Sequence, residues 1–191
     1  MSKYKYARFH PWVGERYDCS PWGFRAMVLG ESHYDTEGAK PAGFTITVVG
    51  RVVNCEDKGY RSRLFPRTAQ LFLKAAEDRW ANRCERHAFW QNMLFYNYIQ
   101  EYVAEKPGIR PTKEVWEDSK NANAFGEVVC IHRPDLILVL GKELWSYVEK
   151  CPTMKSSHIV TVPINHPAWP GWGYKRWIPC LTDAIKKTRR S

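Results

Sequence analysis

A short apolar run at residues 26–30 ends in glycine and passes directly into the polar sequence Glu-Ser-His-Tyr at residues 31–34. Such a run, bounded by glycine, is typical of a buried strand, and a strand end holds loop residues on a rigid base. Two later runs share this plan: residues 93–96 lead into an asparagine, and residues 159–164 lead into Asn-His-Pro. If the strands are parallel, all three polar clusters lie at one carboxyl edge, where open α/β sheets bind ligands.

Strands and helices alternate along most of the chain, which is the pattern of a parallel sheet covered on both faces. We therefore expect one α/β domain over residues 1–191, a three-layer α/β/α arrangement with a central, mainly parallel four-stranded sheet. The expected strands are 26–30, 93–96, 135–141 and 159–164, and the expected helices are about 66–80, 112–129, 142–150 and 174–190.

Two stretches fall outside this alternation. Residues 1–25 are rich in Tyr, Trp, Pro and Arg without periodicity, and we interpret them as an ordered N-terminal arm. Residues 31–65 contain several Gly and Pro residues, including Gly38 and Gly59, and predict a long irregular loop with a short strand at 44–49. Loops of this length in a compact domain are usually functional.

The charge balance favours a polyanionic partner. Lys and Arg number 29 against 20 Asp and Glu, giving a net charge of +9 and a pI near 9.3. Such an excess attracts nucleic acid, and nine Trp and ten Tyr offer surfaces for stacking on bases. A basic surface that only maintains solubility is the alternative. No apolar run approaches the ~20 residues that span a bilayer, and no secretory pattern begins the chain, so we expect a cytoplasmic protein without membrane contact.

Cysteine spacing and motif content exclude several chemistries. The six cysteines contain no C-x-x-C pair, and Cys84-x-x-His87 and Cys130-x-His132 lack the second half of a zinc site, so we expect no metal. The chain also has no G-x-x-x-x-G-K-[ST] phosphate loop, no G-x-S-x-G elbow and no zinc-deaminase signature.

The polar residues at the strand ends suit work on a nucleobase. A carboxylate at Glu31 can orient a water molecule, or it can cap a backbone N–H. An amide at Asn97 can donate and accept at once, as a base edge requires, or it can form a turn. His166 can donate to negative charge on a leaving group, or it can be a packing histidine. His33 and Tyr34 can stack on a base, bind a phosphate or line a wall.

These residues resemble the uracil-DNA glycosylase superfamily over roughly residues 26–185. Gly30 to Tyr34 resembles the family's Gly-Gln-Asp-Pro-Tyr-His or Gly-Glu-Ala-Pro-Gly loop, with Glu31 matching the Glu branch. Phe44, after Pro-Ala-Gly, resembles the Phe that stacks on the extruded base. Asn97 resembles the Asn that reads the base edge.

Three further segments extend the resemblance. Arg110-Pro111-Thr112 with Glu114 is similar to the segment that follows the family's Asn. Residues 133–142 match its fourth-strand pattern closely, and His166-Pro167-Ala168 resembles its closing His-Pro-Ser loop.

The departures concern activity. Ser32 stands where the classical uracil enzymes have the Asp that positions water, His33 replaces a Pro, and Ala168 replaces a Ser. The Leu that fills the vacated base stack is absent, which leaves Trp169 or Trp172 as candidate wedges. The cysteine pattern of the iron–sulfur branch is missing, so we expect no cluster and no other cofactor.

The resemblance implies a DNA N-glycosylase that flips out a damaged or deaminated base, uracil first, and hydrolyses its glycosidic bond. In this interpretation Glu31 and His166 are catalytic, while Trp169 and Trp172 contact single- or double-stranded DNA. The partner is DNA and the protein a monomer. The base-binding residues implied by the resemblance are Phe44, Asn97, Tyr34, His33 and Ser32.

Two alternatives stay open at this stage. The same fold can serve as a non-catalytic module that binds nucleic acid or a partner, an interpretation favoured by Ser32 and His33 in the altered loop. An enzyme acting on free nucleosides or nucleotides is the third possibility, and it would need no wedge.

Overall fold

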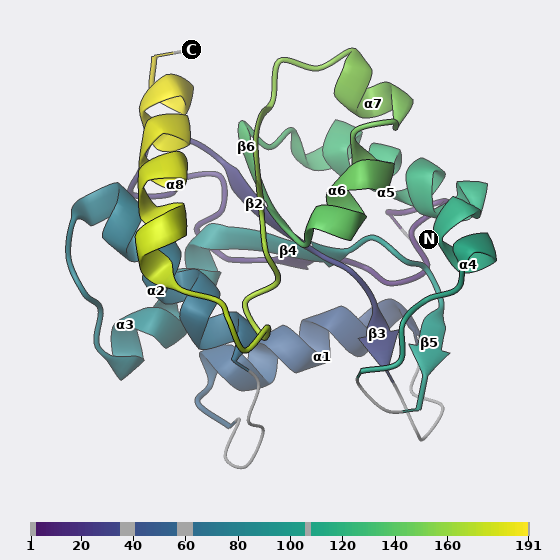
Figure 1. The fold of residues 1–191 in the computed structure, drawn as a ribbon, viewed down its shortest axis with the longest axis horizontal. Helices are drawn as coiled ribbons and strands as arrows, with labels where there is room; N and C mark the ends of the chain where they lie inside the picture. The colour runs from purple at the N-terminus through teal and green to yellow at the C-terminus, as the bar shows by residue number, and fades with distance from the viewer. Residues whose placement is uncertain (1–2, 35–40, 57–62, 106–107, 191) are drawn as a thin grey trace.

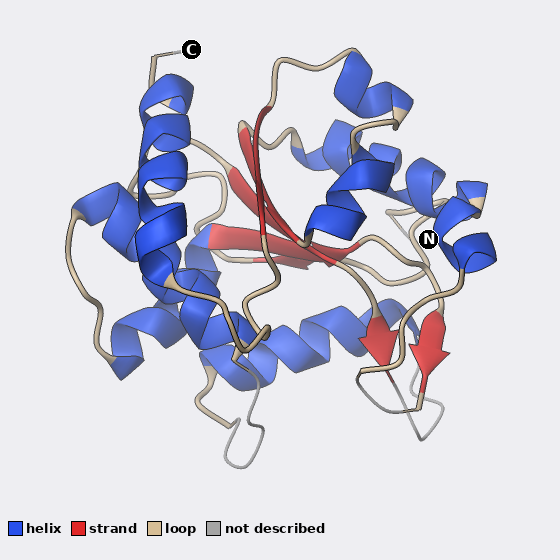
Figure 2. Ribbon diagram, viewed as in Figure 1, coloured by secondary structure: helices blue, strands red, loops and turns tan. Residues whose placement is uncertain are grey.

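The computed structural model describes residues 3–34, 41–56, 63–105 and 108–190 (Figure 1). The predicted loop positions Gly38 and Gly59 lie outside the described residues. Within the described part, helices surround a central sheet (Figure 2), so the α/β class is confirmed.

The central sheet has five strands rather than the predicted four. Four of them are parallel, and a two-residue strand from the N-terminal arm adds to one edge in the antiparallel sense. The fifth strand was missed because two residues in an aperiodic segment give no alternation to detect. In spatial order the strands are β1 (Trp12–Val13), β4 (Met93–Asn97), β2 (Ala26–Gly30), β6 (Leu136–Leu140) and β7 (Val160–Ile164).

Helices connect the strands, and a second, small parallel sheet lies beyond the carboxyl end of β2. It pairs β3 (His33–Tyr34) with β5 (Tyr102–Ala104). The helices are α1 (Pro41–Val53), α2 (Leu64–Glu77), α3 (Arg83–Ala88), α4 (Lys113–Glu117), α5 (Ser119–His132), α6 (Lys142–Val148), α7 (Pro152–Lys155) and α8 (Tyr174–Thr188), with a 3-10 turn at Phe89–Asn92.

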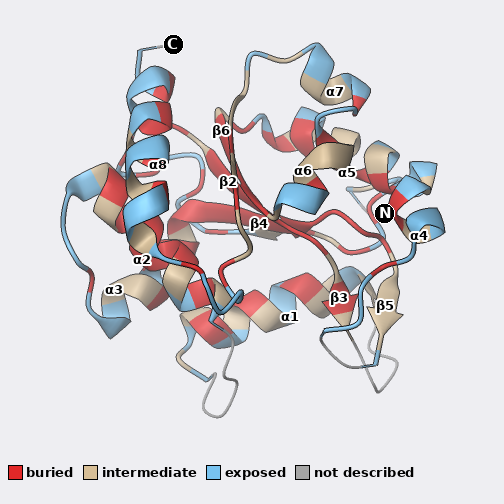
Figure 3. Ribbon diagram, viewed as in Figure 1, coloured by how far each residue is buried: buried red, intermediate tan, exposed pale blue. Residues whose placement is uncertain are grey.

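Alternate side chains of the central strands enter two separate cores, which produces the three layers. On β2, Ala26 and Val28 face a core shared with α1, α2 and α8. Met27 and Leu29 face the opposite core, shared with α5 and α6. The three inner strands β2, β4 and β6 are buried along their whole length (Figure 3), as expected for a parallel sheet covered on both faces.

The strand predicted at residues 44–49 is wrong, because this segment lies inside the helix α1. Its run of Thr, Ile and Val favours strand by propensity, but tertiary packing overrides so weak a preference. Thr45, Val49 and Val52 fall at helical spacing and are the buried residues of α1. Helical periodicity was therefore the stronger signal in this segment.

The N-terminal arm is ordered over its described residues and is anchored on α5. The carboxylate of Glu127 accepts hydrogen bonds from the backbone N–H groups of Lys5, Tyr6 and Ala7, at 2.6–2.9 Å. Farther along, Phe9 is fully buried, and its N–H donates to Gln100 Oε1. The arm thus reaches the carboxyl edge of the central sheet.

Candidate active site

The carboxyl edge of the sheet has a topological switch point at β2. Its neighbours are β4 on one side and β6 on the other, and the chain leaves β2 and β6 in opposite directions. In open α/β sheets, ligands bind at such a switch point. Glu31 follows β2 directly, and Glu143 lies in the first turn of α6, directly after β6.

Arg110 bridges these two carboxylates. Its guanidinium lies 2.8 Å from Glu31 and also pairs with Glu143. Only 10% of the Glu31 side chain is exposed, and this burial raises the pKa of its carboxyl group, against the opposing effect of Arg110. The sequence pointed to the segment containing Arg110 but not to this bridge, because ion pairs between residues 79 positions apart leave no local signal.

Asn97 ends β4 directly beside Gly30, its register partner on β2. A Cβ atom at position 30 would lie 2.1 Å from Asn97 Oδ1, so only glycine fits there. The amide nitrogen of Asn97 donates to the Ser32 carbonyl at 2.9 Å and lies 3.1 Å from His33 Nδ1. Asn97 is therefore buried and fixed against the loop that carries Glu31.

His33 forms an aromatic cluster with Phe9, Phe44 and Tyr102. Its ring centroid lies 4.6 Å from that of Phe9 and 5.0 Å from that of Phe44. Tyr102 completes the cluster through edge contacts with both phenylalanines. His33 Nε2 also lies 2.9 Å from Thr45 Oγ1. Burial lowers the pKa of His33 to about 3, so the ring is neutral near pH 7.

Three of the predicted base-binding residues lie together here, because His33 contacts both Asn97 and Phe44. Phe9 joins from the N-terminal arm, and sequence reasoning missed it because nothing near it in the chain marks a site. Tyr34 points elsewhere: its hydroxyl donates to the Ile109 carbonyl at 3.1 Å, next to Arg110.

His166 follows β7, and the charge of Arg110 acts on it. Burial and the nearby Arg110 charge lower the pKa of its imidazole. Its Nδ1 atom accepts the Ala168 N–H at 3.2 Å. In the neutral ring the proton is consequently on Nε2, which leaves that atom as a hydrogen-bond donor.

The loop after β7, residues 165–173, is held in a fixed shape, and we call it the closing loop. Arg67 donates to the Pro167 carbonyl at 2.6 Å and to the Trp169 carbonyl at 3.4 Å. Trp169 is 52% exposed. Trp172 is only 7% exposed, with its ring 4.7 Å from that of Tyr174. Of the two predicted DNA contacts, only Trp169 is exposed, while the side chain of Trp172 lies in the core.

Among the residues that the structure describes, no three His, Cys, Asp or Glu side chains gather as metal ligands. In the same part of the chain, no helix is both long and apolar enough to cross a membrane.

No protein-family model matches the sequence, and a search of curated proteins also finds no match.

Proposed function

We propose that the protein is a DNA N-glycosylase, a divergent member of the uracil-DNA glycosylase superfamily. One observation carries this proposal: a buried carboxylate, a fixed amide and a neutral imidazole occupy the same carboxyl edge. They are Glu31, Asn97 and His166, and they come from the ends of three parallel strands. The net charge of +9 supports a DNA substrate.

The tautomer of His166 suits the leaving group. When the bond between the sugar C1′ atom and the base breaks, its electron pair leaves with the base, and negative charge develops on a base oxygen. A neutral imidazole that donates from Nε2 stabilises this charge. The Ala168 N–H, bound to Nδ1, holds the ring in that tautomer.

Glu31 suits the other half of the reaction. The sugar passes through a cationic state, which a nearby carboxylate stabilises, and the same carboxylate can orient the water that adds to C1′. The water proton then leaves to solvent, and the base recovers a proton. Arg110 favours the ionised form of Glu31 that this role requires.

Uracil is the base that we propose first. Phe44 would stack on it and Asn97 would read its edge, so the His33 ring that now contacts both must move when a base enters. Extruding a base costs a few kcal/mol, least when it is mismatched or unpaired.

Excision from labelled oligonucleotides tests the proposal. The panel places uracil opposite G, opposite A or unpaired, with thymine opposite G and hypoxanthine as further substrates, and alkali reveals abasic sites. We expect cleavage at uracil that is lost in Glu31→Gln and His166→Ala. His158→Ala, at an exposed histidine, is the matched control and should leave cleavage unchanged. Asn97→Asp should change the base preference.

The contact of His33 with Asn97 and Phe44 favours a second candidate, a non-catalytic module that binds nucleic acid. In that case the imidazole is a permanent filler of the aromatic cluster. Tight DNA binding without cleavage of any substrate in the panel would select this candidate over the glycosylase.

A further inference from the structure

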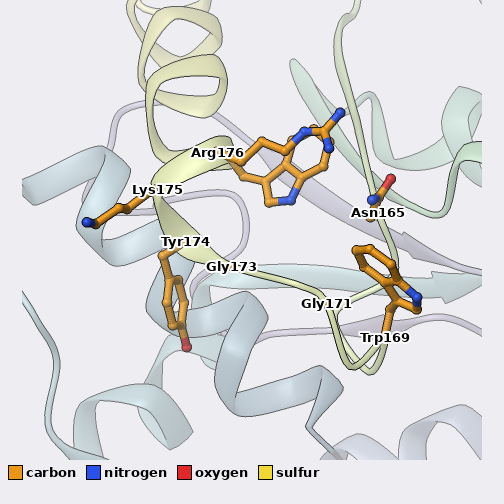
Figure 4. Close-up of a pocket in the computed structure, with 8 residues that line it drawn as sticks. Asn165, Trp169, Gly171, Gly173, Tyr174, Lys175 and Arg176 are labelled. Atoms are coloured by element: carbon orange, nitrogen blue, oxygen red, sulfur yellow. The ribbon is translucent and has the colours of Figure 1, made fainter.

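A separate cavity of about 280 Å³ lies between the closing loop and the start of α8 (Figure 4). It begins one residue before His166, at Asn165, and extends to Arg176 and Trp177 on the helix. Its volume is close to the lower end, roughly 300 Å³, of pockets that hold small organic ligands, so it can take no more than about one nucleotide unit. None of the residues proposed to act on the excised base lines it.

Trp169 supplies a rigid aromatic wall of this cavity. A Cβ atom on Gly171 would lie 2.5 Å from the indole, so the ring lies directly against the glycine backbone. Hydrogen bonds from Trp169 N–H to the His166 carbonyl, and from Arg67 to the closing loop, fix the segment. The indole is still 52% exposed, which gives a base a preformed surface for stacking.

Two polar side chains face the cavity with their bonding capacity unused. Arg176 lies over the Trp177 ring, at 4.8 Å from its centroid, and no carboxylate of the described residues pairs with it. The Asn165 side chain also lines the cavity, and among the described residues it has no hydrogen-bond partner. A guanidinium binds phosphate, and an amide can donate to and accept from a base edge.

We propose that this cavity binds an unpaired nucleotide next to the one that enters the candidate active site. Its base stacks on Trp169, and its phosphate lies at Arg176. A base held in a duplex would first have to leave its stack, at a cost of a few kcal/mol. The protein therefore prefers single-stranded DNA. This inference rests on the proposed function for the place of the neighbouring nucleotide, but its binding step can be measured without excision.

Binding of a fluorescein-labelled single strand of thymidines, followed by anisotropy, tests the inference. Trp169→Ala should weaken binding about tenfold, since stacking on an aromatic side chain is worth ~1–3 kcal/mol per base. Trp169→Phe should restore part of the affinity, which separates stacking from misfolding. Arg176→Ala should weaken binding and lower the slope of log affinity against log salt by about 0.7.

Lys175→Ala is the matched control for charge. Lys175 precedes Arg176 but extends away from Trp169 in Figure 4, so its loss should reduce affinity less than half as much as that of Arg176 on a logarithmic scale. A perfectly paired duplex of the same length should bind more weakly than the single strand.

The two proposals fail in different ways. If Trp169→Ala and Arg176→Ala bind the single strand as the wild type does, the cavity is not a nucleotide site, whether or not uracil is excised. Equal affinity for the single strand and the duplex would also overturn the proposal that the cavity binds an unpaired nucleotide. If no base is excised but both variants lose binding, the nucleotide site stands and the glycosylase proposal falls.

Discussion

Acidification below pH 6.5 should destabilise this protein through the buried imidazole of His33. The ring is 4% exposed, and burial lowers its pKa to about 3 in the folded chain, against 6.5 for the ordinary group. Between pH 6.5 and 3, His33 is therefore protonated in the unfolded chain but stays neutral in the folded chain. The stability contributed by the neutral ring is complete above pH 6.5 and is lost progressively as the pH falls toward 3.

The loss of unfolding free energy follows from the difference between the pKa of His33 in the unfolded and in the folded chain. Each pH unit between the two pKa values is worth about 1.4 kcal/mol, so His33 costs about 2 kcal/mol of unfolding free energy at pH 5. His132, whose pKa burial lowers to about 4, adds a similar amount. Glu31 works in the opposite direction, because its raised pKa lets the folded chain bind a proton first.

Urea unfolding at pH 7 and pH 5, for the wild type and His33→Gln, measures this term. With a slope of ~2 kcal/mol per molar, the wild-type midpoint should fall by about 2 M for the two histidines together, and the variant's by about 1 M. His132→Gln should remove the other half of the fall in the urea midpoint between pH 7 and pH 5. An unchanged pH dependence in His33→Gln would refute the reasoning, because the ring would then be free to take a proton in the fold.

Three further predictions concern the site and the arm. Arg110→Met should move the acid limb of the pH–rate profile to higher pH, because the pKa values of Glu31 and His166 both rise without the cation; an unmoved limb contradicts the bridge. Gly30→Ala should cost ~1–3 kcal/mol in urea unfolding and abolish excision by displacing the adjacent amide. Gly43→Ala, where a Cβ meets no atom within 4 Å, is its control and should be nearly neutral. Glu127→Gln should cost ~1–3 kcal/mol and expose the arm to proteolysis, and an arm equally protected in both proteins would contradict this anchoring.

The sequence predicted most of the central sheet because its four parallel strands are mainly apolar runs that end at or just before Gly or Asn. The helix expected from residue 112 does begin there, because the Thr112 side chain caps α4. Local chemistry also indicated Glu31 and Asn97 at strand ends.

Contacts between residues far apart in the chain could not be predicted from the sequence. Phe9 enters the aromatic cluster from the arm, 24 residues before His33 in the chain, and no periodicity marks it. Trp172 is buried against Tyr174 and Arg67. Because the contact with Arg67 arises only in the folded chain, the sequence did not distinguish Trp172 from Trp169 as a candidate DNA contact. Residues 44–49 show the remaining failure, where a β-branched run concealed a helical face.

Single-turnover excision of uracil by Glu31→Gln and Glu143→Gln tests the central claim most directly. Both carboxylates pair with Arg110, but only Glu31 is buried, at 10% side-chain exposure against 53% for Glu143. A loss of activity in Glu31→Gln, with Glu143→Gln within a few-fold of the wild type, is the predicted result. Equal activity in Glu31→Gln and the wild type would remove Glu31 from the chemistry and contradict the proposed site.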